Sequence, residues 1–269
     1  MNTDKNMTDE EAKRFIRKRT IVSFSVFFIG IVLAVLAWNW LRSGKDDNGI
    51  SSHLRTVLNA DEKVNNAIFS EKHLEKEYPV SKADKDVRVN GDVGMGDNFD
   101  PSKWNLTIIR HPDCKLPDSV MHLGINDVRA FPKKSMTFQF KCIEGWSQIS
   151  WWGGTKLSDF LKKYRLGTHS GRAPDSLHPE DMYKYIGFMT PDSAYYVGID
   201  MKSAIHPQTL LCYEMNGDTL PMEQGFPLRL IIPIKYGVKN IKRIAYMYFS
   251  DTRPPDYWYE RGYEYDAAL

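Results

Sequence analysis

The sequence has 269 residues, of which 42% are hydrophobic, 13% aromatic and 26% charged, and this composition is typical of a folded globular protein. Its three cysteines are too few for a disulfide framework or a four-thiolate iron–sulfur cluster, and no CxxCH motif is present for covalent attachment of haem. The net charge is +2, but five cations crowd residues 13–19. Removing them from the 36 basic residues leaves 31 against 34 acidic residues, so no nucleic-acid partner is expected.

Residues 21–41 form the first predicted element, a helix that spans a membrane. The stretch contains no ionisable residue, and about 20 apolar residues in a helix cross the roughly 30 Å hydrocarbon core. The five cations precede it, and Trp38 and Trp40 lie at its other end. Because positive charge stays in the cytoplasm, we expect a cytoplasmic basic tail over residues 1–20. The rest of the chain is then anchored to the inner membrane by a single pass and lies on the periplasmic side.

A cleaved signal peptide is the alternative interpretation of this helix. Its apolar core would span about 7–15 residues and end in a small-x-small site. The stretch here is longer, and Ala34 and Ala37 have a different spacing. The sequence therefore favours an anchor.

Residues 42–84 are polar and are predicted to form a partly helical stalk. Two short apolar patterns with helical spacing occur at residues 54–58 and 64–68. Asp61 is expected to cap the second. Nothing in this segment indicates chemistry.

Residues 85–269 are predicted to form one domain of the α+β class, because short strand patterns of irregular spacing are combined with few helices. A helix is expected over residues 155–164, capped by Thr155, with a loop over 167–181 and a hairpin turn at Asn216–Gly217. Strands are expected at residues 104–108, 136–142, 183–189, 210–215, 228–232 and 241–249.

Cys142 is the residue whose chemistry needs an explanation. It shares the parity of Met136, Phe138 and Phe140, so a strand here places its sulfur on the buried face. Free cysteines are often small core residues, and the alternative is a thiolate ligand for a soft or high-valent metal. These residues alone leave both interpretations open.

Two segments resemble the sulfite oxidase family of molybdopterin-dependent oxidoreductases. The first, FQFKCIEGWSQISWWGGTKLSDFL, is similar to the segment around the molybdenum-binding cysteine of that family. The second, residues 204–244, is similar to another family signature nearly end to end. The loop formed by Cys142, Glu144, Trp146 and Ser147 resembles that of the bacterial periplasmic branch, to which methionine sulfoxide reductase catalytic subunits belong.

The resemblance implies a sulfite-oxidase-type molybdopterin-binding domain that holds one molybdenum–molybdopterin (Mo-MPT) per chain. Cys142 would be the catalytic thiolate and the only protein ligand of the metal. Gln224 stands where the reductases have an asparagine and keeps an amide. The positions that match cofactor-binding positions of the family are Asn90, Cys142, Thr190, Gln224, Arg229, Asn240, Ile241 and Lys242.

Several of these positions also have structural interpretations. Residues 235–242 could be a solvated basic strand edge, and Arg229 could belong to a structural ion pair. A structural role is also the simpler interpretation for His206 and for Cys212. Tyr195 and Tyr196 could line the substrate pocket or could be ordinary strand residues, and the sequence indicates no role for Cys114.

The implied activity is two-electron oxygen-atom transfer on a small-molecule or protein-bound oxide. Reduction of an S- or N-oxide is favoured over sulfite oxidation, because no arginine-rich stretch accompanies the cysteine loop and no immunoglobulin-like dimerisation domain is expected after residue 263. Sulfite-oxidase-like oxidation and a non-catalytic anchored binding module are the alternatives.

The expected electron donor is a haem-containing partner, because the chain has no haem or cluster motif of its own. A b-type membrane protein is the first candidate and a soluble periplasmic cytochrome the second. One feature departs from the resemblance: members of this branch are exported folded by a twin-arginine signal, and the basic cluster has no clean pattern of that kind.

Overall fold

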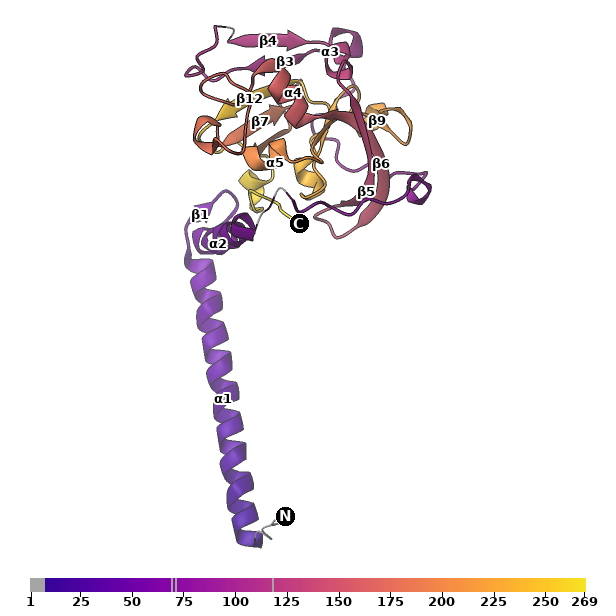
Figure 1. The fold of residues 1–269 in the computed structure, drawn as a ribbon. Coiled ribbons are helices and arrows are strands. Elements are labelled where there is room, and N and C mark those ends of the chain that lie inside the picture. The colour runs from indigo at the N-terminus through magenta and orange to yellow at the C-terminus, as the bar shows by residue number, and fades with distance from the viewer. Residues whose placement is uncertain (1–7, 69, 71, 118) are drawn as a thin grey trace. The chain divides into compact units, whose positions relative to one another are not determined.

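The computed structural model describes residues 8–68, 70, 72–117 and 119–269. It divides into two compact units, one that ends at Leu58 and one that comprises Asn59–Leu269. Figure 1 shows the course of the chain.

The first unit contains a long helix, α1 (Asp9–Ser43), and a two-stranded hairpin of β1 (Asp46–Asp47) and β2 (Ile50–Ser51). The Thr8 side chain and Glu11 form a capping box at the start of α1. The five basic residues at positions 13–19 therefore lie in the same helix as the predicted span. None of its residues is buried, and by length and composition it is long and apolar enough to cross a membrane.

Helix α2 (Ser52–Ile68) includes both apolar patterns that were expected to form separate short helices. The prediction that Asp61 caps a helix is therefore wrong, because this residue lies inside α2. No glycine or proline interrupts residues 52–68, so nothing in the sequence breaks the helix between the two patterns.

Two five-stranded sheets form the second unit. One has the order β10-β9-β6-β5, with β11 also pairing β9, and the other has the order β4-β3-β12-β7-β8. All pairs are antiparallel except β3 with β12. The strands of the first sheet are β5 (Lys133–Lys141), β6 (Ser147–Lys156), β9 (Leu210–Met215), β10 (Asp218–Thr219) and β11 (Arg229–Ile231). Those of the second are β3 (Leu106–Ile109), β4 (Val120–Leu123), β7 (Tyr185–Met189), β8 (Tyr196–Asp200) and β12 (Tyr246–Ser250).

Three short α-helices complete the unit: α3 (Ile125–Arg129), α4 (Leu157–Tyr164) and α5 (Met201–Ile205). Helix α4 buries Leu157, Phe160 and Leu161, as its predicted apolar stripe requires. The expected cap at Thr155 is wrong: β6 continues through Lys156, and the Thr155 hydroxyl donates to the Val128 carbonyl oxygen at 2.6 Å. The 3₁₀ turns are Val80–Lys82, Pro101–Lys103, Pro179–Asp181, Met222–Gln224, Gly237–Lys239 and Tyr259–Arg261.

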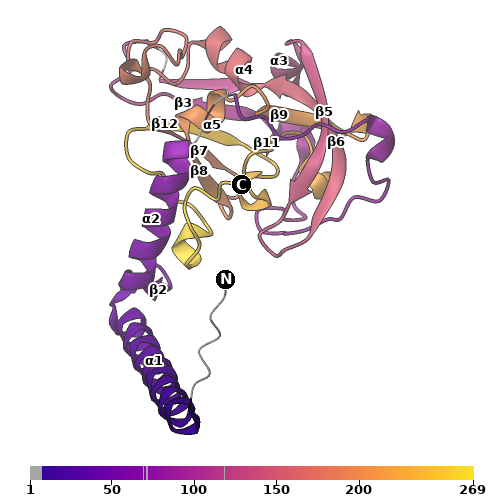
Figure 2. The same ribbon diagram turned by 60° about the horizontal axis from the view of Figure 1, so that its bottom comes forward.

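Strand β9 is buried on both faces and separates two parts of the core. Leu211 and Tyr213 belong to the larger cluster, which includes the apolar residues of α4, β7 and β8. Leu210 and Cys212 belong to a smaller cluster with Met136, Phe138, Phe140 and Trp152 of the β5–β6 hairpin. Figure 2 shows this long hairpin beside β9 and β11. The candidate site lies over the smaller cluster.

The α+β prediction is confirmed, and most expected strands are present with shifted ends. Strand β9 has the predicted bounds, and the turn after it has positive φ at Asn216 and Gly217 as expected. The strand expected over 241–249 is confirmed only from Tyr246, because Arg243 adopts a φ of 49° and turns the chain before the ladder begins. Strand β6 was not predicted, because two tryptophans and two glycines hide its alternation.

Candidate active site

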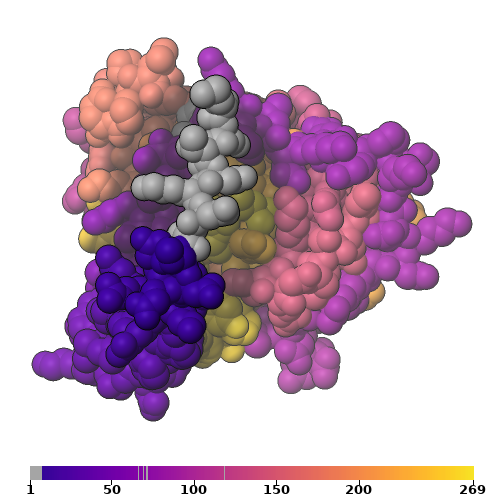
Figure 3. Space-filling view, turned by 90° about the horizontal axis from the view of Figure 1, so that it is seen from below, coloured from indigo at the N-terminus to yellow at the C-terminus, as the bar shows by residue number. Residues whose placement is uncertain are grey.

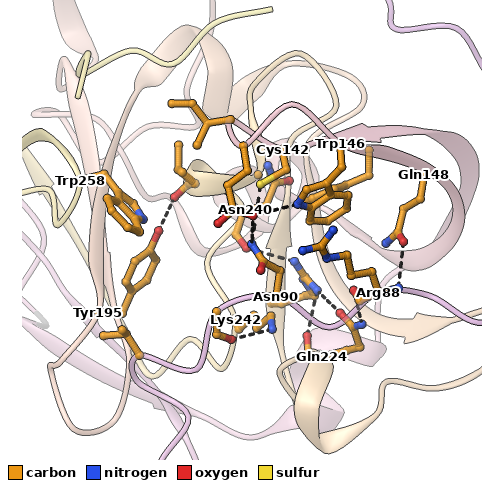
Figure 4. A pocket seen from close by; sticks show the side chains of 18 of the residues that line it. Arg88, Asn90, Cys142, Trp146, Gln148, Tyr195, Gln224, Asn240, Lys242 and Trp258 are labelled. Atoms are coloured by element: carbon orange, nitrogen blue, oxygen red, sulfur yellow. Dashed lines mark hydrogen bonds between the residues drawn. The ribbon is translucent and has the colours of Figure 1, made fainter. Parts of the chain in front are cut away.

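A pocket opens beside the turn that joins β5 to β6, and most of its walls come from segments outside the regular strands (Figure 4). The residues that line it fall into three groups: a thiol with its neighbours, a set of cations and amides, and a set of aromatic side chains. The lining residues used below are Arg88, Asn90, Cys142, Glu144, Trp146, Tyr195, Gln224, Arg229, Val238, Asn240, Lys242, Trp258 and Tyr263, with Phe140 and Trp152 beneath them.

Cys142 follows directly after β5, and the turn it begins fixes its position. Its backbone N–H donates to the Trp146 carbonyl oxygen at 2.9 Å, and its own carbonyl oxygen accepts from Gly145 at 3.0 Å. Gly145 has a φ of 89°, a conformation that glycine adopts at little cost. The Cys142 side chain is 7% exposed and reaches the pocket, so it is neither packed in the middle of the core nor free in solvent.

The surroundings of this thiol hold it neutral in the cofactor-free protein. Burial is the largest cause that raises the pKa of Cys142, and the Glu144 carboxylate raises it further. Backbone N–H groups of the turn and the Arg88 guanidinium act in the opposite direction. A bound metal would displace the proton, because a coordinating thiol is deprotonated outright.

Asn90 joins the thiol to the acid beside it. Its amide Nδ2 lies 3.7 Å from the Cys142 sulfur and 3.4 Å from Oε2 of Glu144. The same carboxylate oxygen accepts a hydrogen bond from the Trp146 indole at 3.0 Å. Asn90 is thus placed to donate to a thiolate, and Glu144 holds the amide in that orientation.

Arg229 is a buried cation without an acidic partner. It is the first residue of β11, where it pairs with Cys212, and its side chain is 3% exposed. Nη1 donates to both oxygens of Gln224 at 3.0 Å and Nη2 donates to the Asn240 carbonyl oxygen at 3.2 Å, but Nε has no partner. Within the described residues no carboxylate lies within 4 Å of the guanidinium, and its burial lowers the pKa of Arg229 to about 10.

Lys242 is a second cation whose partners are main-chain oxygens. Its Nζ donates to the carbonyl oxygens of Gly91 and Glu223, both at 3.0 Å. Burial, followed by repulsion from Arg229, lowers the pKa of Lys242 to about 8. Arg88 adds a third positive charge and lies over the Trp146 ring, 4.8 Å from its centroid. Gln224 ties these segments together, because its amide donates to the Arg88 carbonyl oxygen at 3.2 Å.

Two of the predicted cofactor-binding residues lie outside this pocket, and a third lines it with its side-chain amide already engaged. Thr190 is fully buried. Its hydroxyl donates to Asp192 at 2.6 Å and accepts from the Tyr195 N–H at 3.1 Å, so it holds the Tyr195 backbone in place. Ile241 packs in the larger core cluster. Asn240 lines the pocket, but its amide oxygen accepts from the Ile232 N–H at 2.6 Å and its amide nitrogen donates to the Tyr236 carbonyl oxygen at 3.1 Å.

The aromatic residues of the pocket include two that the sequence did not single out and one, Tyr195, that it offered as a pocket residue. Trp258 and Tyr263 come from the C-terminal segment, and Tyr195 precedes β8. The Tyr195 hydroxyl donates to the Val238 carbonyl oxygen at 2.7 Å, and burial raises its pKa. The density of aromatic residues in YWYERGYEY was the available signal, but aromatic runs are more often structural.

The remaining candidates lie outside the pocket. His206 is fully buried, and its ring nitrogen Nε2 lies 3.1 Å from the His73 carbonyl oxygen. Cys212 is a core residue, and its burial raises its pKa to about 12. Tyr196 forms a hydrogen bond with Glu260, and the Cys114 sulfur lies 3.7 Å from the Thr168 carbonyl oxygen.

The donor set fits an anionic cofactor that brings most of the metal ligands itself. Among the described residues, no group of three or more His, Cys, Asp or Glu side chains could hold a metal ion, so Cys142 offers one soft donor only. The guanidinium of Arg229, which forms no ion pair with an acid, and the ammonium of Lys242 are groups that bind phosphate oxygens. A dithiolene cofactor with a phosphate tail matches both requirements.

The α+β fold and the donor set of the pocket are thus typical of oxidoreductases that bind a metal through an organic cofactor. The match to the family model "Oxidoreductase molybdopterin binding domain" extends over residues 93–258. The chain belongs to this family, and the resemblance to the sulfite oxidase family is thereby confirmed.

Similar proteins include subunits of methionine sulfoxide reductases. A protein of Azospira oryzae named "Putative protein-methionine-sulfoxide reductase subunit YedZ1" is 29% identical over 222 residues, which are 82% of this chain and 78% of that protein. The catalytic subunit MsrP of Xanthomonas campestris pv. campestris is 29% identical over 173 residues, 61% of this chain and 53% of that protein. MsrP of Campylobacter jejuni is 29% identical over 177 residues, with 62% and 55% covered. The chain therefore spans about half the length of these MsrP subunits.

Among solved structures, the sulfane dehydrogenase SoxCD from Paracoccus pantotrophus has a partial likeness to this chain. The TM-score is 0.46 and the sequence identity 17%, over 58% of this chain and 40% of that one.

Proposed function

We propose that this chain is a membrane-anchored Mo-MPT oxidoreductase that reduces S-oxides, with methionine sulfoxide as the first candidate substrate. The observation that carries the proposal is the position of Cys142 in the wall of a pocket that also contains a buried guanidinium and a half-buried ammonium, both of which donate to uncharged oxygens. Similarity to proteins named as methionine sulfoxide reductase subunits supports the choice of substrate class.

Five polar residues of the pocket have a task in this proposal. The thiolate of Cys142 would ligate molybdenum, and Asn90 would donate to that sulfur and fix its orientation. Arg229 and Lys242 would bind the phosphate of the pterin, and Gln224 would hold the guanidinium in place. When bound, molybdenum supplies two-electron oxygen-atom transfer. The aromatic side chains exclude water from the reacting centre.

Helix α1 supports membrane attachment in this proposal. It has the length and composition of a spanning helix, with its cations on the N-terminal side of the apolar stretch. We expect the catalytic unit to lie in the periplasm and to take electrons one at a time from a b-type haem partner in the same membrane. Purification of the full chain in mild detergent should bring down a protein with haem absorbance.

The first experiment compares variants of two cysteines in the full-length protein. Cys142→Ser is expected to lose nearly all molybdenum, measured by elemental analysis, together with dye-linked reduction of methionine sulfoxide. Cys114→Ser is the matched control, because this thiol lies outside the pocket, and it should keep both. Retention of molybdenum and activity by the Cys142→Ser protein would disprove the role of the thiolate.

The second experiment decides the direction of the reaction. The wild-type protein is supplied with methionine sulfoxide and a reduced dye, and separately with sulfite and an oxidised dye. Turnover of the sulfoxide alone supports the proposal. Clear sulfite oxidation would replace it with oxidase activity, and molybdenum-loaded protein without either activity would favour a binding module.

A further inference from the structure

The C-terminal segment 256–266 is held in place by two buried ion pairs. Asp256 at its start pairs with Lys239, and Asp266 at its end pairs with Lys235, whose side chain is 3% exposed. Lys235 also lies 3.2 Å from Asp200. All these charges are paired inside the protein, in contrast to the pocket cations, so their role is to fix the backbone between them.

Local hydrogen bonds shape the turn between these two anchors. The second carboxylate oxygen of Asp256 accepts from the Tyr259 N–H at 3.1 Å, and the Tyr263 N–H donates to the Trp258 carbonyl oxygen at 3.1 Å. Gly262 has a φ of 93°, which closes the turn. As a result the rings of Trp258 and Tyr263 meet edge to face, with centroids 5.0 Å apart.

This ring pair is part of the pocket wall. Trp258 and Tyr195 stand on the opposite side of Cys142 from Arg88 and Gln224, as Figure 4 shows. Tyr263 is 37% exposed, and part of the C-terminal segment is visible in yellow at the surface of the second unit in Figure 3. The family match ends at residue 258, so Tyr263 adds to the pocket from beyond the matched region.

The two sides of the pocket differ in the chemistry that they recognise. The charged residues of the pocket are the cations Arg88, Arg229 and Lys242 and the acid Glu144, whereas Tyr195, Val238, Trp258 and Tyr263 present no charged group. Aromatic faces bind methyl groups and polarised sulfur well, and they do not compensate the desolvation of an inorganic anion.

We propose that Trp258 and Tyr263 form a substrate wall that binds the S-methyl group and the neighbouring methylene of a neutral alkyl sulfoxide. The inference rests on the proposed function and deepens it: the wall selects an alkyl sulfoxide over an oxyanion such as sulfite. Lys239 and Asp256 are positioning residues, because they fix the turn that carries the wall without touching the substrate.

The test uses the full-length, molybdenum-loaded protein. In Trp258→Ala and in Tyr263→Ala the KM for the methyl ester of N-acetylmethionine sulfoxide, a neutral substrate, is expected to rise about tenfold, the effect of leaving one or two methylene-sized groups in water, with kcat within about twofold. Lys239→Met is expected to raise KM in the same way at unchanged molybdenum content. Arg261→Ala is the matched control, because this exposed residue of the same turn does not line the pocket. Unchanged KM in both alanine variants would overturn the inference.

A binding measurement separates this inference from the proposed function. The methyl ester of N-acetylmethionine sulfone, a neutral mimic of the substrate's shape, should change the tryptophan fluorescence of the wild-type protein more than that of Trp258→Phe, which keeps Trp146 and Trp152 in the pocket. This change supports the wall even if the wild-type protein reduces no sulfoxide, an outcome that would remove the proposed activity alone. Identical fluorescence responses of the two proteins would overturn the wall.

Discussion

At the residue scale, Arg229 and Lys242 differ from the structural cations of the protein in their hydrogen-bond partners. The cations that pair with acids, such as Lys235 and Lys239, are those that fix the backbone. The two pocket cations donate only to uncharged oxygens, at a cost that burial makes large. We therefore expect an anion to bind beside these two cations.

Arg229→Met should therefore separate stability from cofactor retention. The lowered pKa of Arg229 corresponds to a burial cost of roughly 3 kcal/mol, and the lost hydrogen bonds cost about as much, so the free energy of unfolding should change by less than about 2 kcal/mol. Molybdenum content should fall at least about tenfold. Urea unfolding and elemental analysis measure the two quantities. A variant that loses several kcal/mol of stability but keeps its molybdenum would show that the arginine is structural.

The lowered pKa of Lys242 predicts a pH dependence of the cofactor-free protein. Its pKa is about 8 in the folded state and about 10.5 when unfolded, so the unfolded chain binds more protons between these values. The free energy of unfolding should rise between pH 8 and 10.5 by up to about 3 kcal/mol more in the wild type than in Lys242→Met. Parallel pH profiles of the two proteins would contradict this pKa.

At the element scale, the β5–β6 hairpin and its contact with β9 position the site. The register of β6 against β9 shifts between Gly153 and Gly154. A Cβ on Gly154 would meet the Leu211 carbonyl oxygen and lie 2.7 Å from the Cys212 Cα. Cys212 of β9 pairs with Gly154 of β6 on one side and with Arg229 of β11 on the other. The close approach of β6 to β9 therefore influences how deeply the Arg229 guanidinium is buried.

Gly154→Ala should destabilise the protein by about 1–3 kcal/mol, because backbone atoms of β9 would have to move. Gly153→Ala is a matched control, since its Cβ would meet mainly the movable Glu214 side chain, and it should cost less. Chemical denaturation compares the two variants. Equal losses would mean that the close contact at Gly154 is unimportant.

The sequence predicted the elements whose signal is local, and its failures have identifiable causes. The apolar stripe of α4 and the alternating apolar residues of β5 were sufficient to predict these two elements, because each pattern reports one buried face. Thr155 was misassigned because its hydroxyl bonds Val128, which is distant in sequence. Trp258 and Tyr263 reach the pocket only through the pairing of Asp256 and Asp266 with distant lysines, which no local pattern reveals.

At the scale of the whole molecule, the chain combines a long exposed helix with a catalytic unit that has its own core. The resemblance predicted the family. Five of the cofactor-binding residues that it implied line one pocket in the structure: Asn90, Cys142, Gln224, Arg229 and Lys242. The apolar core, both sheets and the pocket are formed by residues of the second unit alone. Attachment and catalysis are therefore expected to be separable.

Deletion of residues 1–44 should move the protein from the membrane fraction to the soluble fraction, because it removes α1 and leaves α2 whole. Molybdenum content and dye-linked sulfoxide reduction should remain, whereas electron uptake from the membrane partner should be lost. Membrane flotation and elemental analysis test the first two statements. Continued flotation of the deleted chain would show that another part binds the membrane.

If the pterin binds as proposed, the bonds of Lys242 and Arg229 to main-chain oxygens imply an order of maturation. The carbonyl groups of Gly91, Glu223, Gln224 and Asn240 accept hydrogen bonds from these two cations, so the cations need no phosphate to hold them in place. Insertion would then exchange peptide oxygens for phosphate oxygens around preassembled cations. We therefore expect loading to follow folding.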